Sequence, residues 1–262
     1  MKIKVFADAE SAARQAAALT AADARAAVAE RDRFVMAVSG GHTPWIMLSA
    51  LTQEDIPWAK IHIAQVDERV APAEHPDRNL THLRGSLLEH ASLPSRQIYA
   101  MPVEAPDLET AARQYAATLA NLAGSPPVFD LIHLGLGRDG HTASLVPADP
   151  VLEISDADVG VTGVYQERRR MTLTYPVLNR ARRILWLVTG SEKIGVLGLC
   201  SRLIPQFQPG ELAKTTPHCS SIVRRLRMGN LVVKIRKASN NSSAKANKAK
   251  EREKRHACWN RY

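Results

Sequence analysis

The chain has 262 residues, 45% of them hydrophobic and 23% charged, which is the composition of a globular protein with one large domain or two small ones. No apolar run approaches the ~18 residues of a membrane span, and the first eight residues lack the apolar core of a signal peptide. The cysteines (Cys200, Cys219 and Cys258) form no Cys-x-x-Cys pair. This pattern argues against a disulfide framework or a zinc site and favours a cytoplasmic location.

The net charge of +9 is the sum of two unlike regions. Residues 1–192 contain 19 Lys and Arg against 23 Asp and Glu, whereas residues 193–262 contain 16 against 3. Residues 238–255 consist mainly of Ala, Ser, Asn and Lys, a composition that predicts disorder. We therefore expect an α/β domain at residues 1–197 and an atypical basic segment at residues 198–262.

Helical segments and short apolar runs alternate along most of the chain. Helices are predicted at residues 8–31, 43–51, 79–89, 107–123 and 176–180, and strands at 34–38, 61–66, 128–135, 159–164, 171–174, 184–189 and 230–236. Thr43 is the expected cap of the second helix, with Pro44 in its first turn. The alternation predicts a three-layer, Rossmann-like α/β fold, with a mostly parallel open sheet and helices on both faces.

The most informative segment runs from Phe129 to Ser144, where an apolar strand ends in glycines that are followed by Asp139 and His141. Open α/β sheets bind ligands at the carboxyl ends of their strands. Histidine exchanges protons near neutral pH, so His141 is a candidate general base, with Asp139 or another carboxylate fixing its tautomer. The alternative interpretation is an ordinary helix start with Asp139 as its cap.

A second glycine turn, Ser39-Gly40-Gly41, connects the strand at residues 34–38 to the following helix. Backbone N–H groups at such a turn, together with the positive end of the helix, suit a phosphate group. An ordinary strand-to-helix turn would have the same sequence features.

Arginines follow two of the predicted strands. Arg69 could pair with an anionic substrate, with Asp67 or Glu68 orienting it, although a surface ion-pair cluster is the alternative. Arg170 could reach a phosphate group, whereas its neighbours Arg168 and Arg169 are expected to be solvated.

Other catalytic devices are poorly supported by the sequence. The histidines have no metal-ligand spacing, and no Gly-x-Ser-x-Gly elbow is present for a serine nucleophile. His62 and His133 lie inside apolar runs, where packed structural roles are expected.

These motifs together resemble the 6-phosphogluconolactonases over about residues 1–197. Ser39 to Pro44 is similar to that family's Ser-Gly-Gly-x-Thr-Pro loop, and Gly135 to Pro147 to its Gly-x-Gly-x-Asp-Gly-His-Thr-Ala-Ser-x-x-Pro signature, with Val146 in place of the usual Phe. The same resemblance includes Asp67-Glu68-Arg69 with the downstream His75 and Asn79, and the strand from Arg170 to Thr174. It also includes Asn179-Arg180-Ala181 and Thr189-Gly190-Ser191-Glu192-Lys193. The related glucosamine-6-phosphate deaminases continue the Gly-His turn with Ile-Ala-Phe-Asn-Glu-Pro, so the sequence favours the lactonase.

The resemblance implies hydrolysis of 6-phospho-D-glucono-1,5-lactone to 6-phosphogluconate in the oxidative pentose phosphate route. His141 is then the general base and Asp139 its partner. The phosphate group is bound by Arg69, Arg170 and the turn Ser39-Gly40-Gly41. The resemblance implies no metal, organic cofactor or membrane partner, and we expect a monomer or a homodimer.

After about Gly195 the sequence departs from the family, as a change of reading frame in the source sequence would make it do. An inactive family member is therefore one alternative function. The other is a nucleic-acid-binding protein that uses the basic segment, although that segment has no nucleic-acid-reading motif.

Overall fold

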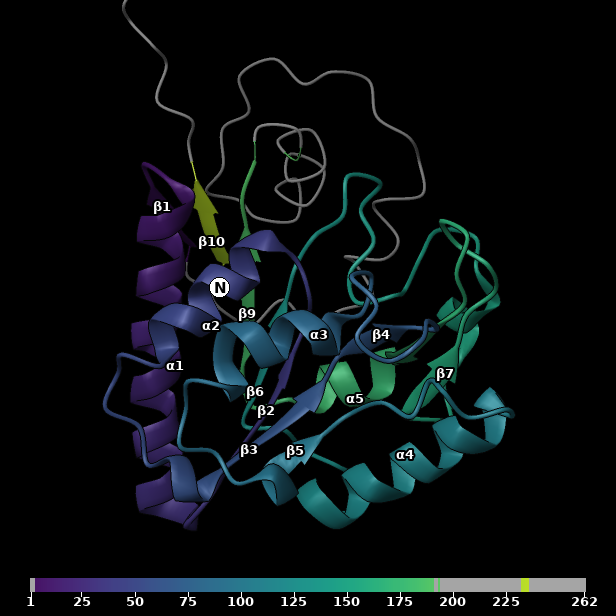
Figure 1. Cartoon of the computed structure of the whole chain (residues 1–262), viewed down its shortest axis with the longest axis horizontal. Coiled ribbons are helices and arrows are strands. Elements are labelled where there is room, and N and C mark those ends of the chain that lie inside the picture. The colour runs from purple at the N-terminus through teal and green to yellow at the C-terminus, as the bar shows by residue number, and fades with distance from the viewer. Residues whose placement is uncertain (1–2, 191–192, 194–231, 236–262) are drawn as a thin grey trace, which may run out of the picture.

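The computed structural model describes residues 3–190, 193 and 232–235, and its main element is a seven-stranded sheet (Figure 1). The strand order is β1-β10-β9-β6-β2-β3-β5, and every neighbouring pair is parallel. The strands are β1 (Ile3–Phe6), β2 (Phe34–Val38), β3 (Ile61–Gln65), β5 (Ile98–Tyr99), β6 (Leu131–Leu134), β9 (Ile184–Val188) and β10 (Val232–Ile235).

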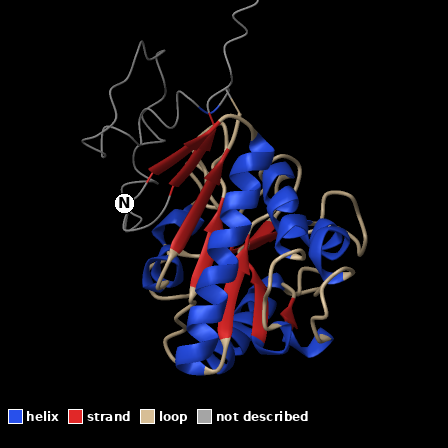
Figure 2. Ribbon diagram, turned by 90° about the vertical axis from the view of Figure 1, so that its left-hand side faces the viewer, coloured by secondary structure: helices blue, strands red, loops and turns tan. Residues whose placement is uncertain are grey.

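Helices cover both faces of this sheet, as predicted. On one face lie α1 (Ala9–Arg31), α2 (His42–Leu51) and α3 (Asn79–Leu83), and on the other lie α4 (Leu108–Ala123) and α5 (Tyr175–Arg180). Figure 2 shows α1 in front of the strands. No helix among the described residues is both long and apolar enough to span a membrane.

The strands of the main sheet have two buried faces, as parallel strands between helix layers require. In β2, Phe34, Met36 and Val38 pack in the core on the α1 side, whereas Val35 and Ala37 pack in the core on the α4 side. This double burial explains why β2 is a continuous apolar run in the sequence. Its predicted bounds are confirmed at both ends.

A second, antiparallel sheet is the main departure from the expected topology. Its order is β4 (Asp67–Arg69), β8 (Arg170–Leu173) and β7 (Val159–Val161). The runs predicted at residues 159–164 and 171–174 therefore form strands outside the parallel sheet. Residues 67–69 were expected only as charges at a strand end, because three polar residues carry no local strand signal. They become a strand by pairing with β8.

Other differences are local. The strands β1 and β5 were not predicted, and the helix expected at residues 79–89 is α3 followed by a π-helical turn at Arg84–Leu88. The strand predicted at residues 230–236 is confirmed as β10, which lies between β1 and β9 although it follows the predicted domain boundary at residue 197. The disorder predicted at residues 238–255 falls outside the described residues.

Candidate active site

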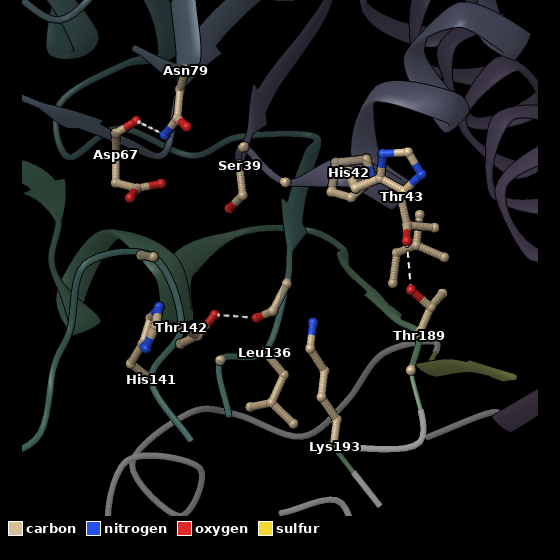
Figure 3. Close-up of a pocket in the computed structure, with 18 of the residues that line it drawn as sticks. Ser39, His42, Thr43, Asp67, Asn79, Leu136, His141, Thr142, Thr189 and Lys193 are labelled. Atoms are coloured by element: carbon tan, nitrogen blue, oxygen red, sulfur yellow. Dashed lines mark hydrogen bonds between the residues drawn. The ribbon is translucent and has the colours of Figure 1, made fainter. Parts of the chain in front are cut away.

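A cavity of 380 Å³ lies at the carboxyl ends of β2, β3, β6 and β9, where the motifs converge (Figure 3). Six of the seven predicted site residues line it: Ser39, Gly40, Gly41, Arg69, His141 and Arg170. The seventh, Asp139, does not line the cavity but is bonded to His141, which does. The tertiary structure thus brings together segments that are separated by up to about 130 residues in the sequence.

The loop after β2 is held in place by β6. The Ser39 hydroxyl donates to the backbone carbonyl of His133 (3.1 Å), and the Ser39 N–H donates to His133 Nδ1 (3.4 Å). Gly41 is the N-cap of α2, with φ of +124°, and makes no side-chain capping bond. The first amides of α2 therefore have no side-chain cap at the cavity, which is an arrangement that suits an anion.

The predicted capping role of Thr43 is wrong, because Thr43 lies inside the first turn of α2. Its hydroxyl instead bonds the hydroxyl of Thr189, which follows β9. Pro44 occupies the first turn, as predicted. The bond between Thr43 and Thr189 joins two walls of the cavity (Figure 3).

Gly40 is required by the close approach of Asn79. A Cβ atom at residue 40 would lie 1.9 Å from Asn79 Oδ1. The Asn79 amide donates to the Asp67 carbonyl (2.9 Å), and its oxygen accepts from Arg69 (3.4 Å). Gly40 thus allows Asn79 to link the β2 loop to β4.

Glu68 is fully buried, so the interpretation of Asp67-Glu68-Arg69 as a surface ion-pair cluster is wrong for its central residue. The Glu68 carboxylate accepts hydrogen bonds from the backbone N–H groups at the start of α3, and Arg78 pairs with it at 3.2 Å. Its hydrogen-bond donors are Gln65 Nε2, Arg69 N, Asn79 N and Leu80 N. Glu68 therefore anchors α3 to the strand that carries Arg69.

Asp67 is also buried, and its carboxylate accepts from the Ser144 hydroxyl (2.7 Å). Burial raises the pKa of Asp67, although the bond from Ser144 and the charge of Arg170 oppose the shift. Ser144 N donates to the Thr172 hydroxyl (3.1 Å), which ties the His141 loop to β8. Asp67 thus links β4 to the loop that carries His141.

The two predicted anion-binding arginines face each other. Arg69 and Arg170 are directly paired in the antiparallel register of β4 and β8, and both line the cavity. Arg170 is buried, and burial lowers the pKa of its guanidinium. Like charges at directly opposite positions are unfavourable in a sheet, and the carboxylate of Asp67 offsets part of the repulsion at Arg170.

Arg168 and Arg169, which were expected to be solvated, both make ion pairs. Arg168 pairs with Asp77 (2.9 Å), and Arg169 pairs with Glu109 (3.0 Å). They fasten the segment before β8 to the loop at residues 71–78 and to α4.

The loop after β6 holds a carboxylate–imidazole pair. Asp139 Oδ1 lies 2.6 Å from His141 Nδ1 and also accepts from the backbone N–H of His141 (3.2 Å). Burial alone would raise the pKa of Asp139, but the bonds from His141 and Tyr165 outweigh it and hold that pKa well below its usual range. Because Asp139 is then ionised, His141 Nδ1 carries the proton and the ring's lone pair is on Nε2.

Gly137 makes space for this pair, since a Cβ atom at residue 137 would lie 2.2 Å from His141 Nδ1 and 2.7 Å from Asp139 Oδ1. Turns follow residue 137, so the alternative interpretation of Asp139 as a helix cap is wrong. The glycine-rich spacing therefore positions a carboxylate and an imidazole.

Tyr165 was not singled out from the sequence, and Lys193 entered only as the last residue of the Thr189-Gly190-Ser191-Glu192-Lys193 motif. The side chain of Lys193 points into the cavity (Figure 3). Tyr165 donates from its hydroxyl to Asp139 Oδ2 (2.8 Å). A tyrosine in a polar loop carries no local signal, because its role depends on contacts across the fold.

His133 is packed inside the fold, as predicted for a histidine in an apolar run, whereas His62 is only half-buried. His133 is fully buried, and burial lowers its pKa to about 4. His62 Nδ1 bonds the Tyr99 hydroxyl (3.1 Å), and burial together with two arginines lowers its pKa. Neither residue lines the cavity.

Comparison with known proteins agrees with this geometry. Residues 7–217 match the family described as "Glucosamine-6-phosphate isomerases/6-phosphogluconolactonase", beyond the limit of the sequence resemblance at about residue 197. The chain is 43% identical over 176 residues to a 6-phosphogluconolactonase of Synechocystis, a match that covers 66% of this chain and 73% of that protein. It is 34% identical over 209 residues to the GDH/6PGL endoplasmic bifunctional protein of Homo sapiens, covering 75% of this chain and 26% of that longer protein.

Among solved structures, a 6-phosphogluconolactonase from Shewanella baltica superposes with a TM-score of 0.74 at 25% identity, over 90% of this chain and 97% of that one. The expected family is therefore confirmed, together with the three-layer fold. The chain belongs to the glucosamine-6-phosphate isomerase/6-phosphogluconolactonase family.

Proposed function

We propose that this protein hydrolyses 6-phospho-D-glucono-1,5-lactone to 6-phosphogluconate. The observation that carries the proposal is the 2.6 Å contact between Asp139 and His141 beside a cavity that two arginines line. An oriented imidazole is a suitable base for water, and arginines suit the phosphate group of the substrate. The named relatives act as lactonases, which agrees with this assignment.

The chemistry follows from the orientation of His141. Nε2 takes a proton from water while the water oxygen forms a bond to the lactone carbonyl carbon. The tetrahedral intermediate then collapses, and the bond between that carbon and the ring oxygen breaks. The ring oxygen takes the proton from the imidazolium, which restores the base. The proposal uses neither a metal ion nor an organic cofactor.

Asp139 supports both proton transfers. As an ionised neighbour of Nδ1–H, it stabilises the imidazolium that forms when water is deprotonated. It also keeps the ring in the orientation that directs Nε2 away from the carboxylate. Because a δ-lactone is already an activated ester, one oriented base combined with substrate positioning is sufficient catalysis.

The phosphate group would be bound at a distance from the reacting carbonyl. Arg69 and Arg170 supply the fixed positive charge, and Ser39, Gly40 and Gly41 supply hydroxyl and backbone donors. Lys193 adds a third cation to the cavity lining. Binding energy from the phosphate positions the carbonyl against the water molecule.

The assay that tests this function compares three proteins with the spontaneous rate of lactone hydrolysis. The wild type and His90→Ala should be active, because His90 bonds the Gly85 carbonyl outside the cavity. His141→Ala should lose about 10²–10⁴-fold in kcat, the usual contribution of a general base. A folded wild type no faster than the blank would refute the function and support the inactive family member.

We place the enzyme in the cytoplasm, because its cysteine pattern suits a reducing compartment. We expect no nucleic-acid partner, and a nuclease-treated sample should retain full activity. We expect a monomer or a homodimer, which light scattering after size-exclusion chromatography distinguishes.

A further inference from the structure

We propose that Tyr165 is a positioning residue of this site, whose hydroxyl holds the Asp139 carboxylate in the orientation that His141 needs. The inference rests on the proposed function, in which His141 is the base. Tyr165 lies outside the cavity lining, so it acts through Asp139 and not on the substrate.

The two oxygens of Asp139 have different partners. Oδ1 accepts from His141 at Nδ1 (2.6 Å) and at the backbone N–H (3.2 Å), whereas Oδ2 accepts from the Tyr165 hydroxyl (2.8 Å). A carboxylate with donors on both oxygens is fixed in rotation about its Cβ–Cγ bond. Without the tyrosine hydroxyl, Oδ2 would lose this donor and the plane of the carboxylate could turn.

The aromatic ring of Tyr165 contacts two other members of the site. It packs edge-on against the His141 imidazole, with centroids 5.6 Å apart and planes at 71°. The Arg170 guanidinium carbon lies 4.9 Å from its centroid, within the range of a cation–π contact. The Tyr165 side chain therefore contacts Asp139, the proposed base His141 and the proposed phosphate-binding Arg170.

A hydrogen-bonded turn fixes the backbone at Tyr165. Tyr165 and Arg168 bond each other across a tight turn, in which Gln166 and Glu167 have φ of 49° and 64°. Two successive non-glycine residues in the left-handed region are unfavourable. Gln166 also accepts from the Arg170 guanidinium (3.0 Å), which fastens the turn to β8.

The protonated phenol of Tyr165 and the ionised carboxylate of Asp139 require that Tyr165 donates the hydrogen bond between them. Burial and the neighbouring Asp139 raise the pKa of Tyr165 to about 12, so its phenol remains a donor at every pH at which the enzyme would work. The charged groups that face Tyr165 are Asp139 and Arg170. The phenol draws charge from Asp139 and so moderates how tightly the carboxylate holds the imidazolium proton.

The first test is Tyr165→Phe, which removes the hydroxyl and keeps the ring contacts with His141 and Arg170. We expect kcat to fall about tenfold, the scale of one hydrogen bond to a charged group, and KM to change less than about twofold. The acid limb of the kcat–pH profile should move to higher pH. The matched control is Tyr99→Phe, whose hydroxyl bonds His62 outside the cavity, and it should leave kcat, KM and the profile unchanged.

A double-mutant cycle separates positioning from general structural damage. On a background of Asp139→Ala, which lacks the carboxylate, Tyr165→Phe should change kcat less than about twofold. An equal tenfold loss on both backgrounds would overturn the inference, as would an unchanged kcat in the single variant. His141→Ala, measured in the same assay, distinguishes the two proposals. If His141→Ala stays active, the proposed mechanism fails. If His141→Ala is inactive and Tyr165→Phe has the kcat of the wild type, only the positioning role fails.

Discussion

Arg69 and Arg170 are directly opposite each other in the register of β4 and β8, at one wall of the cavity. Their surroundings differ: Arg69 donates to the Asp77 carbonyl (2.7 Å) and to Asn79, whereas Arg170 is buried among Ser144, Tyr165 and Gln166. Like charges at opposite positions of a sheet repel, and the carboxylate of Asp67 offsets part of this repulsion at Arg170. The phosphate group of the proposed substrate would offset the rest when it binds.

Removing one of these arginines should therefore weaken substrate binding more than it slows the chemical step. Arg69→Gln should raise KM about tenfold or more, because a charge-assisted hydrogen bond is lost, with a smaller effect on kcat. Steady-state kinetics measures both constants. Arg96→Gln, on a charge outside the cavity, is the control. A KM for Arg69→Gln equal to that of wild type would contradict the assigned phosphate site.

Gly137 should be essential for activity although it takes no part in the reaction. In Gly137→Ala the new Cβ would meet His141 Nδ1 at 2.2 Å, so the imidazole must move away from Asp139. We expect kcat to fall about 10²-fold, which approaches the loss of the base itself. Gly85→Ala is the matched control, because a Cβ at residue 85 meets nothing within 4 Å. Retention of full activity in Gly137→Ala would contradict the assigned role of His141.

Glu68 should be critical for stability and not for chemistry. Glu68→Gln places a buried NH₂ group among N–H donors and removes the charge that pairs with Arg78, so the free energy of unfolding should fall by about 3–5 kcal/mol. Urea unfolding followed by circular dichroism measures this change. Glu104→Gln removes the exposed partner of Arg78 and should cost less than about 1 kcal/mol. Equal effects of the two substitutions would be inconsistent with an anchoring role for Glu68.

His133 should make stability depend on pH. Its folded pKa of about 4 lies below the ordinary value of 6.5, so between these values the unfolded state binds more protons than the folded state. The contribution of neutral His133 to the free energy of unfolding is therefore fully present above pH 6.5. It is lost as the pH falls toward 4, by about 3 kcal/mol in total.

Unfolding free energies measured at several pH values test this linkage. His133→Asn should flatten the dependence between pH 6.5 and 4, whereas His90→Asn should leave it unchanged. If the unfolding free energy of His133→Asn changed with pH as steeply as that of the wild type, the pH dependence would come from other groups.

The sequence by itself was sufficient for the features that local patterns encode. The apolar run of β2 and the alanine-rich α1 were predicted almost to the residue, because burial and helix propensity act along short segments. The glycine-rich segment likewise indicated His141 as the candidate base. Whether Asp139 or another carboxylate orients it was left open until the structure gave the 2.6 Å contact. These segments established the fold class and the candidate base.

Only the tertiary structure decided which distant residues complete the site. Tyr165 meets Asp139 from 26 residues away, and the pairing of Arg69 with Arg170 exists only once β4 and β8 form a sheet. The same pairing places Glu68 beneath α3, where an acidic residue that reads as a surface charge becomes a buried anchor. Contacts of this kind depend on the packing of the whole domain, which no short segment of sequence specifies.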